Sequence, residues 1–501
     1  MTVVDESDQV VQRRANFEEL RKLGVDPYPH RFDSQASVGE IVQAHGAKDG
    51  DTLDAEHVTT RTAGRILAIR SFGKANFLVL SDGKTRVQVY VRQDALCERD
   101  FQIFKLLDFG DWLGVEGRLF RTKTKELTIW ASKLDFLAKC LLPLPEKWHG
   151  LTDVETRYRQ RYLDLIVNSD ARHIFETRSH VISAAREFLS ARGFLEVETP
   201  MMQSIAGGAL ARPFVTHHNA LDIPLYMRVA PELYLKRLTV GGIERVFEIN
   251  RNFRNEGIST QHNPEFTMLE FYWTYADYTD LMALTEQLLA EVAVKAIGDK
   301  EIQYGDHVIS LKPPFRRLSM REAARDAASA RLGASVDAGD FRHHDAAVAL
   351  AARLGVEVGA GMGPGRITAE IFEAFCEDDL VQPTFIYDFP TEVSPLSKKK
   401  IDDPDTVERF ELYVAGLELA NAFSELNDPA EQRSRFEAQL KQRADGDQEA
   451  HVMDEDYIRA LEFGMPPAAG EGIGIDRLVM LLTNSPAIRD VILFPVMRPK
   501  S

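Results

Sequence analysis

The clearest alternation of hydrophobic and polar residues in this chain runs from Glu244 to Trp273. Its first half places charged or amide side chains at every second position: Glu248, Asn250, Asn252, Arg254 and Glu256. A loop containing Asn263-Pro264 follows, and the second half then alternates again, with Phe266, Met268, Glu270 and Tyr272 on one side. A strand repeats every two residues, so the run predicts a hairpin. Because buried charge is costly unless it is paired or bound, the polar face predicts a charged ligand.

Shorter patterns predict a small β-barrel in the first third of the chain. Residues 9–24 have the spacing of an amphipathic helix that ends at Gly24 and Pro27. From Thr62 to Leu137, short alternating runs are divided by turns, and Asp82-Gly83 is typical of a hairpin. Four or five strands, with a helical stretch over 95–104 before the fourth, favour an oligonucleotide-binding (OB) barrel.

The remainder predicts a larger α+β domain. Two helices are expected at 152–168 and 171–192, before the hairpin, and a mostly helical, Ala-rich insertion at about 320–380. Strands and helices do not alternate, so we expect an antiparallel sheet flanked by helices rather than a doubly wound fold. The expected organisation is a helical extension (1–60), an OB domain (61–140), a linker (141–160, with LLPLPEKWHG at 141–150) and a catalytic domain (161–501).

Composition narrows the class of protein. With 501 residues, 44% hydrophobic and 27% charged, the chain has the profile of a soluble, multidomain globular protein. No apolar run approaches the ~18 residues that span a bilayer, so no membrane partner is expected. The three cysteines are far apart and form neither a disulfide framework nor a zinc motif. The cytoplasm is the expected location.

The charge is unevenly distributed. The net charge is −17, but residues 61–140 carry 15 Lys and Arg against 9 Asp and Glu. The expected barrel is therefore basic on an acidic background, which favours polyanion binding at that domain. Ordinary variation in surface charge is the alternative explanation.

Three motifs, in this order, resemble those of the class II aminoacyl-tRNA synthetases. FLSARGFLEVETPMM resembles the first motif, and GEGIGIDRLVML, which contains Arg477, resembles the third. The residues of the second motif are Phe253, Arg254, Glu256, His262 and Phe266. Segments such as APELYLKRL, HNPEFTMLEFY and FSELND are similar to the lysyl-tRNA synthetases of bacteria. The resemblance covers almost the whole chain and implies an OB domain followed by a class II catalytic domain.

The resemblance assigns the cationic groups to amino-acid activation by ATP. This reaction brings a carboxylate up to an anionic α-phosphate, so the site must supply positive charge. Arg254 would bridge both groups, since a guanidinium bonds two oxygens at once. Arg477 and His262 would hold the outer phosphates. Phe266 would stack on adenine, and Glu256 would accept from the adenine amino group.

The resemblance also implies Mg²⁺, held by Glu411 and Glu418, because magnesium takes carboxylate and phosphate oxygens. Strict alternation would put these two residues on opposite faces of one strand, so a turn near Ala415-Gly416 is expected between them. The spacing alone also fits a helix over 408–425, because Glu411, Glu418 and Glu425 are seven residues apart.

An acidic pocket for L-lysine is the third implication. The residues that match the lysine-binding positions, besides Arg254, are Gly207, Gly208, Glu232, Glu270, Tyr272, Asn421 and Glu425. Several carboxylates around one small ligand fit an ammonium and would repel aspartate. Ala420 and Ala422 flank Asn421 where many bacterial relatives have glycine. Both are small, so no change of substrate is expected.

The remaining implications concern partners. Phe77 and Gln88 match positions that read the anticodon of tRNA(Lys), although the pattern alone equally fits Phe77 as a core aromatic. The first motif forms a dimer interface in this class, so a homodimer is expected. No protein general base is assigned, because positioning and charge can carry both steps.

Other motifs have plainer explanations. GAGMGPGR (359–366) lacks the Lys-Ser/Thr of a phosphate loop and is interpreted as a loop or helix lead-in, with Pro364 unfavourable for a helix start. The adjacent histidines at 217–218 and 343–344 do not converge as metal ligands. Three alternative functions are a ligase that attaches lysine to a protein side chain, an aspartate or asparagine tRNA ligase, and an inactive tRNA-binding paralogue. The expected barrel argues against the protein-modifying ligase, and the acidic pocket argues against the aspartate or asparagine ligase. The complete catalytic set argues against the inactive paralogue.

Overall fold

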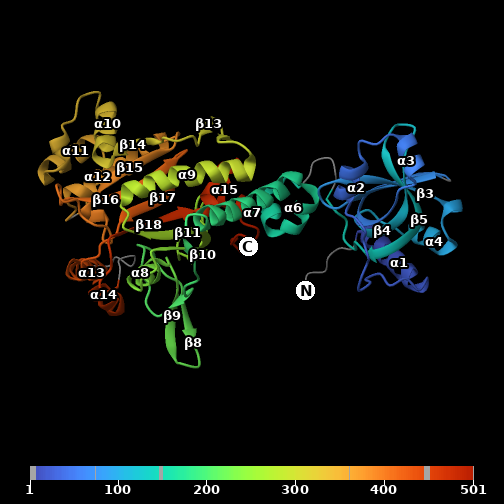
Figure 1. The fold of residues 1–501 in the computed structure, drawn as a ribbon, viewed down its shortest axis with the longest axis horizontal. Helices are drawn as coiled ribbons and strands as arrows, with labels where there is room; N and C mark the ends of the chain where they lie inside the picture. The colour runs from blue at the N-terminus through green and yellow to red at the C-terminus, as the bar shows by residue number, and fades with distance from the viewer. Residues whose placement is uncertain (1–6, 74, 146–150, 360, 445–451, 500–501) are drawn as a thin grey trace. The chain divides into compact units, whose positions relative to one another are not determined.

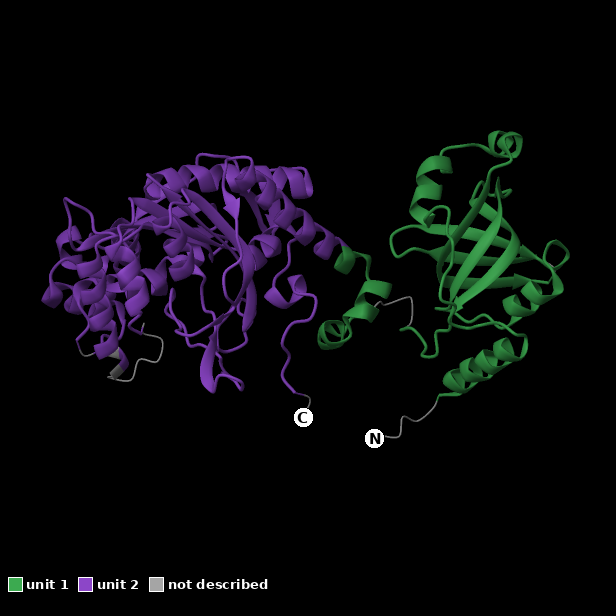
Figure 2. Cartoon of the chain, turned by 60° about the horizontal axis from the view of Figure 1, so that its bottom comes forward, with its two compact units in different colours: residues 1–172 green, residues 173–501 purple. Residues whose placement is uncertain are grey.

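The computed structural model describes residues 7–73, 75–145, 151–359, 361–444 and 452–499. Residues 146–150 of the expected linker lie outside this set. The chain divides into two compact units, residues 1–172 and 173–501, which Figure 2 colours separately. Within the described residues, no helix combines the length and the apolar character needed to cross a bilayer.

The first unit contains a closed five-stranded barrel of order β1-β2-β3-β5-β4 (Figure 1). Its strands are β1 (Thr59–Phe72), β2 (Ala75–Ser81), β3 (Arg86–Arg92), β4 (Trp112–Arg121) and β5 (Leu127–Ala138). Alternate side chains point inward, so Leu78, Leu80 and Val89 are fully buried while Phe77, Val79 and Gln88 are only partly buried. The barrel confirms the predicted OB fold.

Short helices pack around the barrel: α1 (Asp8–Lys22), α2 (Val38–His45), α3 (Gly50–Glu56) and α4 (Glu98–Lys105). Two more, α5 (Val154–Arg159) and α6 (Arg161–Val167), follow the expected linker and contact each other. The single helix predicted over 152–168 is wrong, because the helical backbone is interrupted at Gln160 (φ −120°, ψ 56°) and two short helices result. The helix before the fourth strand is α4, as predicted.

The second unit is built on an eight-stranded sheet of order β14-β15-β16-β17-β18-β11-β10-β6. The strands are β6 (Leu195–Glu196), β10 (Arg245–Phe253), β11 (Glu265–Thr274), β14 (Arg316–Ser319), β15 (Thr384–Pro390), β16 (Thr406–Val414), β17 (Leu417–Ser424) and β18 (Ala468–Gly474). The six inner strands pair antiparallel, as predicted, whereas β6 and β14 at the edges pair parallel.

Helices α7 (Ser169–Ser190), α9 (Tyr278–Ile297) and α15 (Ile475–Leu482) enclose the main hydrophobic core with this sheet (Figure 1). Alternate residues of each strand enter this core, for example Ala469 and Ile473 of β18. The intervening glycines 470, 472 and 474 border a cavity. The sheet thus has an apolar side and a side that carries polar groups.

Smaller elements complete the second unit. They are β7 (Met202–Gln203), β8 (Val215–His218), β9 (Ile223–Met227), α8 (Glu232–Val240), β12 (Glu301–Tyr304), β13 (His307–Ser310), α13 (Pro429–Ala444), α14 (Glu455–Glu462) and α16 (Ile488–Val491). The region 320–380 contains α10 (Met320–Leu332), α11 (His344–Leu354) and α12 (Pro364–Phe375), which share their own apolar cluster. Pro364 is the first residue of α12, so its description as unfavourable for a helix start is wrong. The missing N–H of proline costs nothing in the first turn.

Candidate active site

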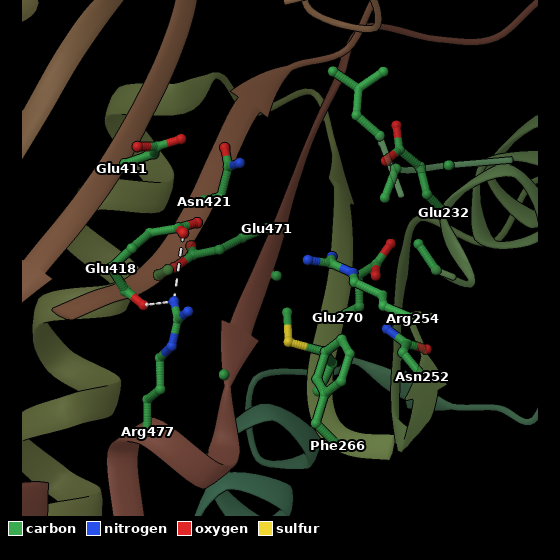
Figure 3. Close-up of a pocket in the computed structure, with 18 of the residues that line it drawn as sticks. Glu232, Asn252, Arg254, Phe266, Glu270, Glu411, Glu418, Asn421, Glu471 and Arg477 are labelled. Carbon is green, nitrogen blue, oxygen red and sulfur yellow. Dashed lines mark hydrogen bonds and ion pairs between the residues drawn. The ribbon is translucent and has the colours of Figure 1, made fainter. Parts of the chain in front are cut away.

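One cavity of about 390 Å³ brings together residues that are far apart in the sequence. Of the sequence-predicted catalytic, ATP, lysine and metal residues, it is lined by Gly208, Glu232, Arg254, Glu256, His262, Phe266, Glu270, Tyr272, Glu411, Glu418, Asn421 and Arg477. Figure 3 shows Arg477 and Glu418 on one side of the cavity and Glu232 and Glu270 on the other. We call the first side, with His262, the cationic end, and the second, with Tyr272, the acidic end.

The predicted hairpin provides much of this wall. In β10 and β11, Glu248 lies opposite Glu270 and Asn252 lies opposite Phe266, which confirms the predicted polar face. β10 ends at Phe253, however, so Arg254 and Glu256 lie in the loop beyond the strand rather than on it. The Arg254 N–H still donates to the Pro264 carbonyl at 2.9 Å, which anchors the start of this loop.

Arg254 lies between the two ends with unused hydrogen-bonding capacity. Its guanidinium carbon is 5.1 Å from the centre of the Phe266 ring. Its Nε is buried and has no hydrogen-bond partner among the described residues. Burial lowers the pKa of Arg254, with Glu256 opposing, but a guanidinium stays charged in this range. An anionic group would satisfy this side chain.

The cationic end combines Arg477 of α15 with His262. Arg477 Nη1 donates to the Glu418 carbonyl and lies 3.4 Å from the Glu418 carboxylate. Its Nη2 is 3.5 Å from His262 Nε2. The Ser259 hydroxyl accepts two backbone N–H groups and lies 2.9 Å from His262 Nδ1.

Arg477 can only donate, so its 3.5 Å contact makes His262 Nε2 an acceptor and places the ring proton on Nδ1, toward the Ser259 hydroxyl. Partial burial of the ring lowers the pKa of His262, and the Arg477 charge lowers it further, so the ring is neutral at neutral pH. The Arg477 guanidinium is then the donor group beside His262. Phosphate oxygens suit a guanidinium, because it offers them several N–H donors at once.

The two predicted metal ligands lie on one β-hairpin. Ala415 (φ 53°) and Gly416 (φ 71°) form the turn between β16 and β17, so the helix alternative for 408–425 is wrong. A bulge between Leu412 and Tyr413 then brings Glu418 opposite Tyr413, on the same side as Glu411. The predicted turn therefore does place both carboxylates in one cavity.

Glu411 is held by neighbours that the sequence interpretation missed. Arg409 Nη2 donates to Glu411 Oε1 at 2.5 Å, and the Tyr413 hydroxyl donates to Oε2 at 2.6 Å. Arg409 Nε also donates to Asn421 Oδ1 at 3.1 Å. Burial raises the pKa of Glu411 to about 7, with Arg409 opposing and Glu418 adding to the rise. Arg409 lies two residues before Glu411 in the strand, and this period of two was the signal that could have revealed it.

The acidic end consists of buried groups. Glu232 and Glu270 each expose 6% of their surface. The Tyr272 hydroxyl donates to Glu270 Oε1 at 2.8 Å. Burial raises the pKa of Glu270 to about 8, and the charge of Glu232 adds to this rise. At neutral pH the isolated Glu270 therefore keeps its proton, and a cationic ligand would favour its release.

Two predicted residues, Gly207 and Glu425, lie behind the cavity wall rather than in it. Glu425 Oε2 forms an ion pair with Lys236, and among the described residues its Oε1 has no hydrogen-bond partner. A Cβ on Gly470 would overlap both the Glu425 carboxylate and the Tyr272 ring, so glycine is required there. Glu425 is thus adjacent to Tyr272. Gly208, next to Gly207, lines the cavity with a φ of +93°.

The predicted anticodon residues lie on the outer surface of the barrel. Phe77 is half-buried and does not belong to the barrel core, so the interpretation as a core aromatic is wrong. Gln88 Nε2 donates to Thr128 Oγ1 at 3.0 Å. The sequence interpretation missed the aromatic row that Phe77 joins, which comprises Phe72, Tyr90, Phe120 and Trp130. The Arg118 guanidinium carbon lies 4.8 Å from the centre of the Trp130 ring.

Comparison with known proteins agrees with this geometry. Residues 153–498 match the family of class II tRNA synthetases (D, K and N), and residues 60–137 match the OB-fold nucleic acid binding domain. Lysine–tRNA ligase of Carboxydothermus hydrogenoformans is 53% identical over 494 residues, 99% of each chain. The enzyme of Pelotomaculum thermopropionicum is 53% identical over 97% of this chain and 94% of its own, and that of Bacillus subtilis is 52% identical over 99% and 98%. The chain belongs to the class II tRNA synthetases.

Proposed function

We propose that this protein is a lysine–tRNA ligase. It would join L-lysine to ATP, giving lysyl-adenylate and pyrophosphate, and then transfer the lysyl group to the terminal ribose of tRNA(Lys). The observation that carries the proposal is a single cavity whose cationic end faces an acidic end, with Arg254 between them. The names of the similar enzymes support the same activity.

Arg254 is the expected catalytic centre of activation. The lysine carboxylate attacks the α-phosphorus of ATP, and the bond to the bridging oxygen of pyrophosphate breaks. Arg254 would bond a carboxylate oxygen and an α-phosphate oxygen, which reduces their repulsion as they approach. Arg477 and His262 would hold the outer phosphates. Adenine would stack on Phe266, and its amino group would donate to Glu256.

Class II tRNA synthetases are ATP-dependent and use a divalent metal, and the residues here fit one. We propose Mg²⁺ as this metal, held by Glu411 and Glu418. Two carboxylates facing one cavity form an oxygen donor set, which phosphate oxygens can complete. When bound, the metal would neutralise part of the charge of the triphosphate. Arg409 and Tyr413 would keep the Glu411 carboxylate oriented.

The acidic end favours lysine over the other amino acids of the family. Glu232, with the Gly208 backbone, would accept from the α-amino group, while Tyr272 and Glu270, backed by Glu425, would receive the side-chain ammonium. Asn421 would contribute a further polar contact. Aspartate would add a further carboxylate to these groups, which Coulomb repulsion disfavours. Among the described residues, Arg409 also lines the cavity, but its guanidinium is already bonded to Glu411 and Asn421.

The barrel supports tRNA as the acceptor rather than a protein. An OB-fold nucleic acid binding domain is present, and its aromatic row offers faces on which bases stack. We propose that Phe77 stacks on an anticodon base and that Gln88 reads an adjacent one. Phe77→Ala should weaken tRNA charging about tenfold while leaving lysine-dependent ATP–pyrophosphate exchange unchanged. An equal loss in both assays would contradict this role.

We also propose a homodimer and a cytoplasmic location. Large apolar side chains are exposed close together in the sequence around β6 to β9: Leu195, Met202, Val215, Leu221 and Ile223. Contiguous exposed apolar surface is typical of association sites. The cytoplasm holds the tRNA and ATP that the reaction needs. Sedimentation equilibrium should give twice the mass of one chain, and a monomer at micromolar concentration would refute the dimer.

The decisive test is ATP–pyrophosphate exchange with each amino acid in turn and without tRNA. Exchange should depend on L-lysine and on a divalent metal. Aspartate and asparagine should give no exchange. The acidic end repels the aspartate carboxylate, and asparagine has no side-chain ammonium to pair with the carboxylates there. Exchange with aspartate or asparagine instead of lysine would overturn the substrate assignment, and no exchange with any amino acid would favour an inactive paralogue.

A further inference from the structure

Lys236 is a buried charged residue that the proposed reaction does not use. It lies on α8, one turn after Glu232, and its side chain is fully buried. Its Nζ is 2.5 Å from Glu232 Oε1 and also forms an ion pair with Glu425 Oε2. Burial acts to lower the pKa of Lys236, but these two carboxylates outweigh it and raise the pKa above its ordinary value. The amine is therefore a permanent ammonium.

The position of Lys236 relative to the cavity determines what this ammonium can do. Lys236 does not line the cavity, whereas Glu232 does. The Lys236 amine also lies 5.3 Å from the centre of the Phe423 ring, and Phe423 lines the cavity. The ammonium is therefore behind the wall, close enough to hold the wall residues but turned away from a ligand.

The two carboxylates that Lys236 joins belong to opposite ends of the proposed lysine site. Glu232 would receive the α-amino group, and Glu425 backs Tyr272 at the side-chain ammonium. Glu232 is fixed in the first turn of α8, and the Glu425 N–H donates to Ala468 of β18 at 2.8 Å. One nitrogen thus links a helix to the sheet through one oxygen of each carboxylate.

We propose that Lys236 is a specificity-determining positioning residue that fixes the separation between the acceptors for the two amino groups of the substrate. This inference rests on the proposed function. With one oxygen of each carboxylate held by Lys236, Glu232 at the cavity and Glu425 behind Tyr272 are kept at one separation. A diamino acid of the matching length satisfies both acceptors. L-ornithine, one methylene shorter, leaves one of them without its ammonium.

Charge balance supports the same role. Without Lys236, Glu232 and Glu425 would be two buried carboxylates close together, and mutual repulsion would protonate one of them or move them apart. Either change would remove an acceptor from one end of the substrate. Burial raises the pKa of both carboxyls, and Lys236 opposes that rise while it holds one oxygen of each in place before the substrate arrives. The substrate then meets a preorganised site.

The test compares Lys236→Met with the unsubstituted enzyme in ATP–pyrophosphate exchange, using L-lysine and L-ornithine. Methionine has a similar length and no charge. We expect kcat/KM for lysine to fall more than that for ornithine, so that the preference for lysine decreases about tenfold or more. The KM for ATP should not change. A folded variant that keeps its preference overturns the inference, and so does one whose KM for ATP rises in parallel, since that indicates general loosening.

Two further variants make the result decisive. Lys139→Met is the matched control, because Lys139 in the barrel is equally buried and also joins two carboxylates, Asp108 and Asp111. It should leave the lysine-to-ornithine ratio unchanged. If Lys236→Met does not fold, Lys236→Arg retains the charge but changes the separation of the carboxylates, and the same ratio should fall. An unchanged ratio in Lys236→Arg would overturn the proposal. If the unsubstituted enzyme shows no exchange with lysine, the proposed function fails instead.

Discussion

The two ends of the cavity differ in how deeply their charged groups are buried. At the cationic end, His262 is exposed, and Arg477 and Glu418 are only half-buried. At the acidic end, Glu232, Glu270 and Tyr272 are almost wholly buried. Guanidinium groups keep their charge in either setting, whereas carboxylates lose theirs on burial unless a cation joins them. The cationic end is therefore charged in advance, and the acidic end completes its charge with the substrate.

Arg254→Ala should have the largest effect, because Arg254 serves both ends. Exchange should fall about a thousandfold, the upper range for loss of one group that stabilises transition-state charge. Arg254→Lys should recover only part of the rate, since an ammonium cannot bond two oxygens in the same planar geometry. Circular dichroism of both variants checks the fold. Near-normal exchange in Arg254→Ala would show that the cavity does not depend on this charge.

Glu270→Gln tests the acidic end alone. The substitution keeps the shape and an acceptor for the Tyr272 hydroxyl. It removes the negative charge that Glu270 would gain by losing its proton when an ammonium binds. We expect kcat/KM for lysine to fall about a hundredfold, with the KM for ATP unchanged. A parallel rise in the KM for ATP would mean that the two ends are not separate in the way their burial indicates.

Proton release sharpens the comparison further. The pKa of Glu270 is raised to about 8, so below this pH the empty site holds a proton that lysine must displace. Lysine affinity should therefore increase about tenfold per pH unit between pH 6 and pH 8 and level off above. Calorimetry in buffers of different ionisation enthalpy should detect up to one proton released per lysine at pH 7. Glu270→Gln should release less, and release of the same size from this variant would assign the proton elsewhere.

The sequence predicted the barrel, the sheet and most of the site because these depend on local periodicity. The alternation in 244–273 was enough to predict a polar face containing Glu270, and the turn at Ala415-Gly416 placed Glu411 beside Glu418. Arg409 and Lys236 were missed because their importance arises from contacts between distant segments. Lys236 pairs with Glu425, which lies 189 residues later in the chain, and no pattern within α8 reveals that partner. The position of Glu425 behind the wall was missed for the same reason.

The smallest expected effect concerns Glu471, a buried carboxyl to which no role in the reaction is assigned. Substituting it tests the effect of burial on a carboxyl apart from substrate binding. Its carboxyl lies beside Thr285 of α9, with oxygen distances of 2.7 and 2.6 Å, and the Thr285 hydroxyl is also 2.7 Å from the Leu281 carbonyl. One hydroxyl proton cannot serve all three acceptors, so a protonated Glu471 donates to Thr285, which donates to Leu281. Burial raises the pKa of Glu471 to about 8.

Because the unfolded chain ionises Glu471 near its ordinary pKa of 4.5 while the folded chain keeps the proton to about 8, stability should fall as pH rises between these values. The slope is at most about 1.4 kcal/mol per pH unit, and no further loss follows above pH 8. Glu471→Gln can make the same donation to Thr285 without ionising. It should therefore remove this slope and raise the melting temperature of the second unit by a few degrees at pH 8, measured by calorimetry. An unchanged slope would show that Glu471 is already ionised in the fold, and that a buried carboxyl in this sheet can keep its charge without the cation that Glu270 requires.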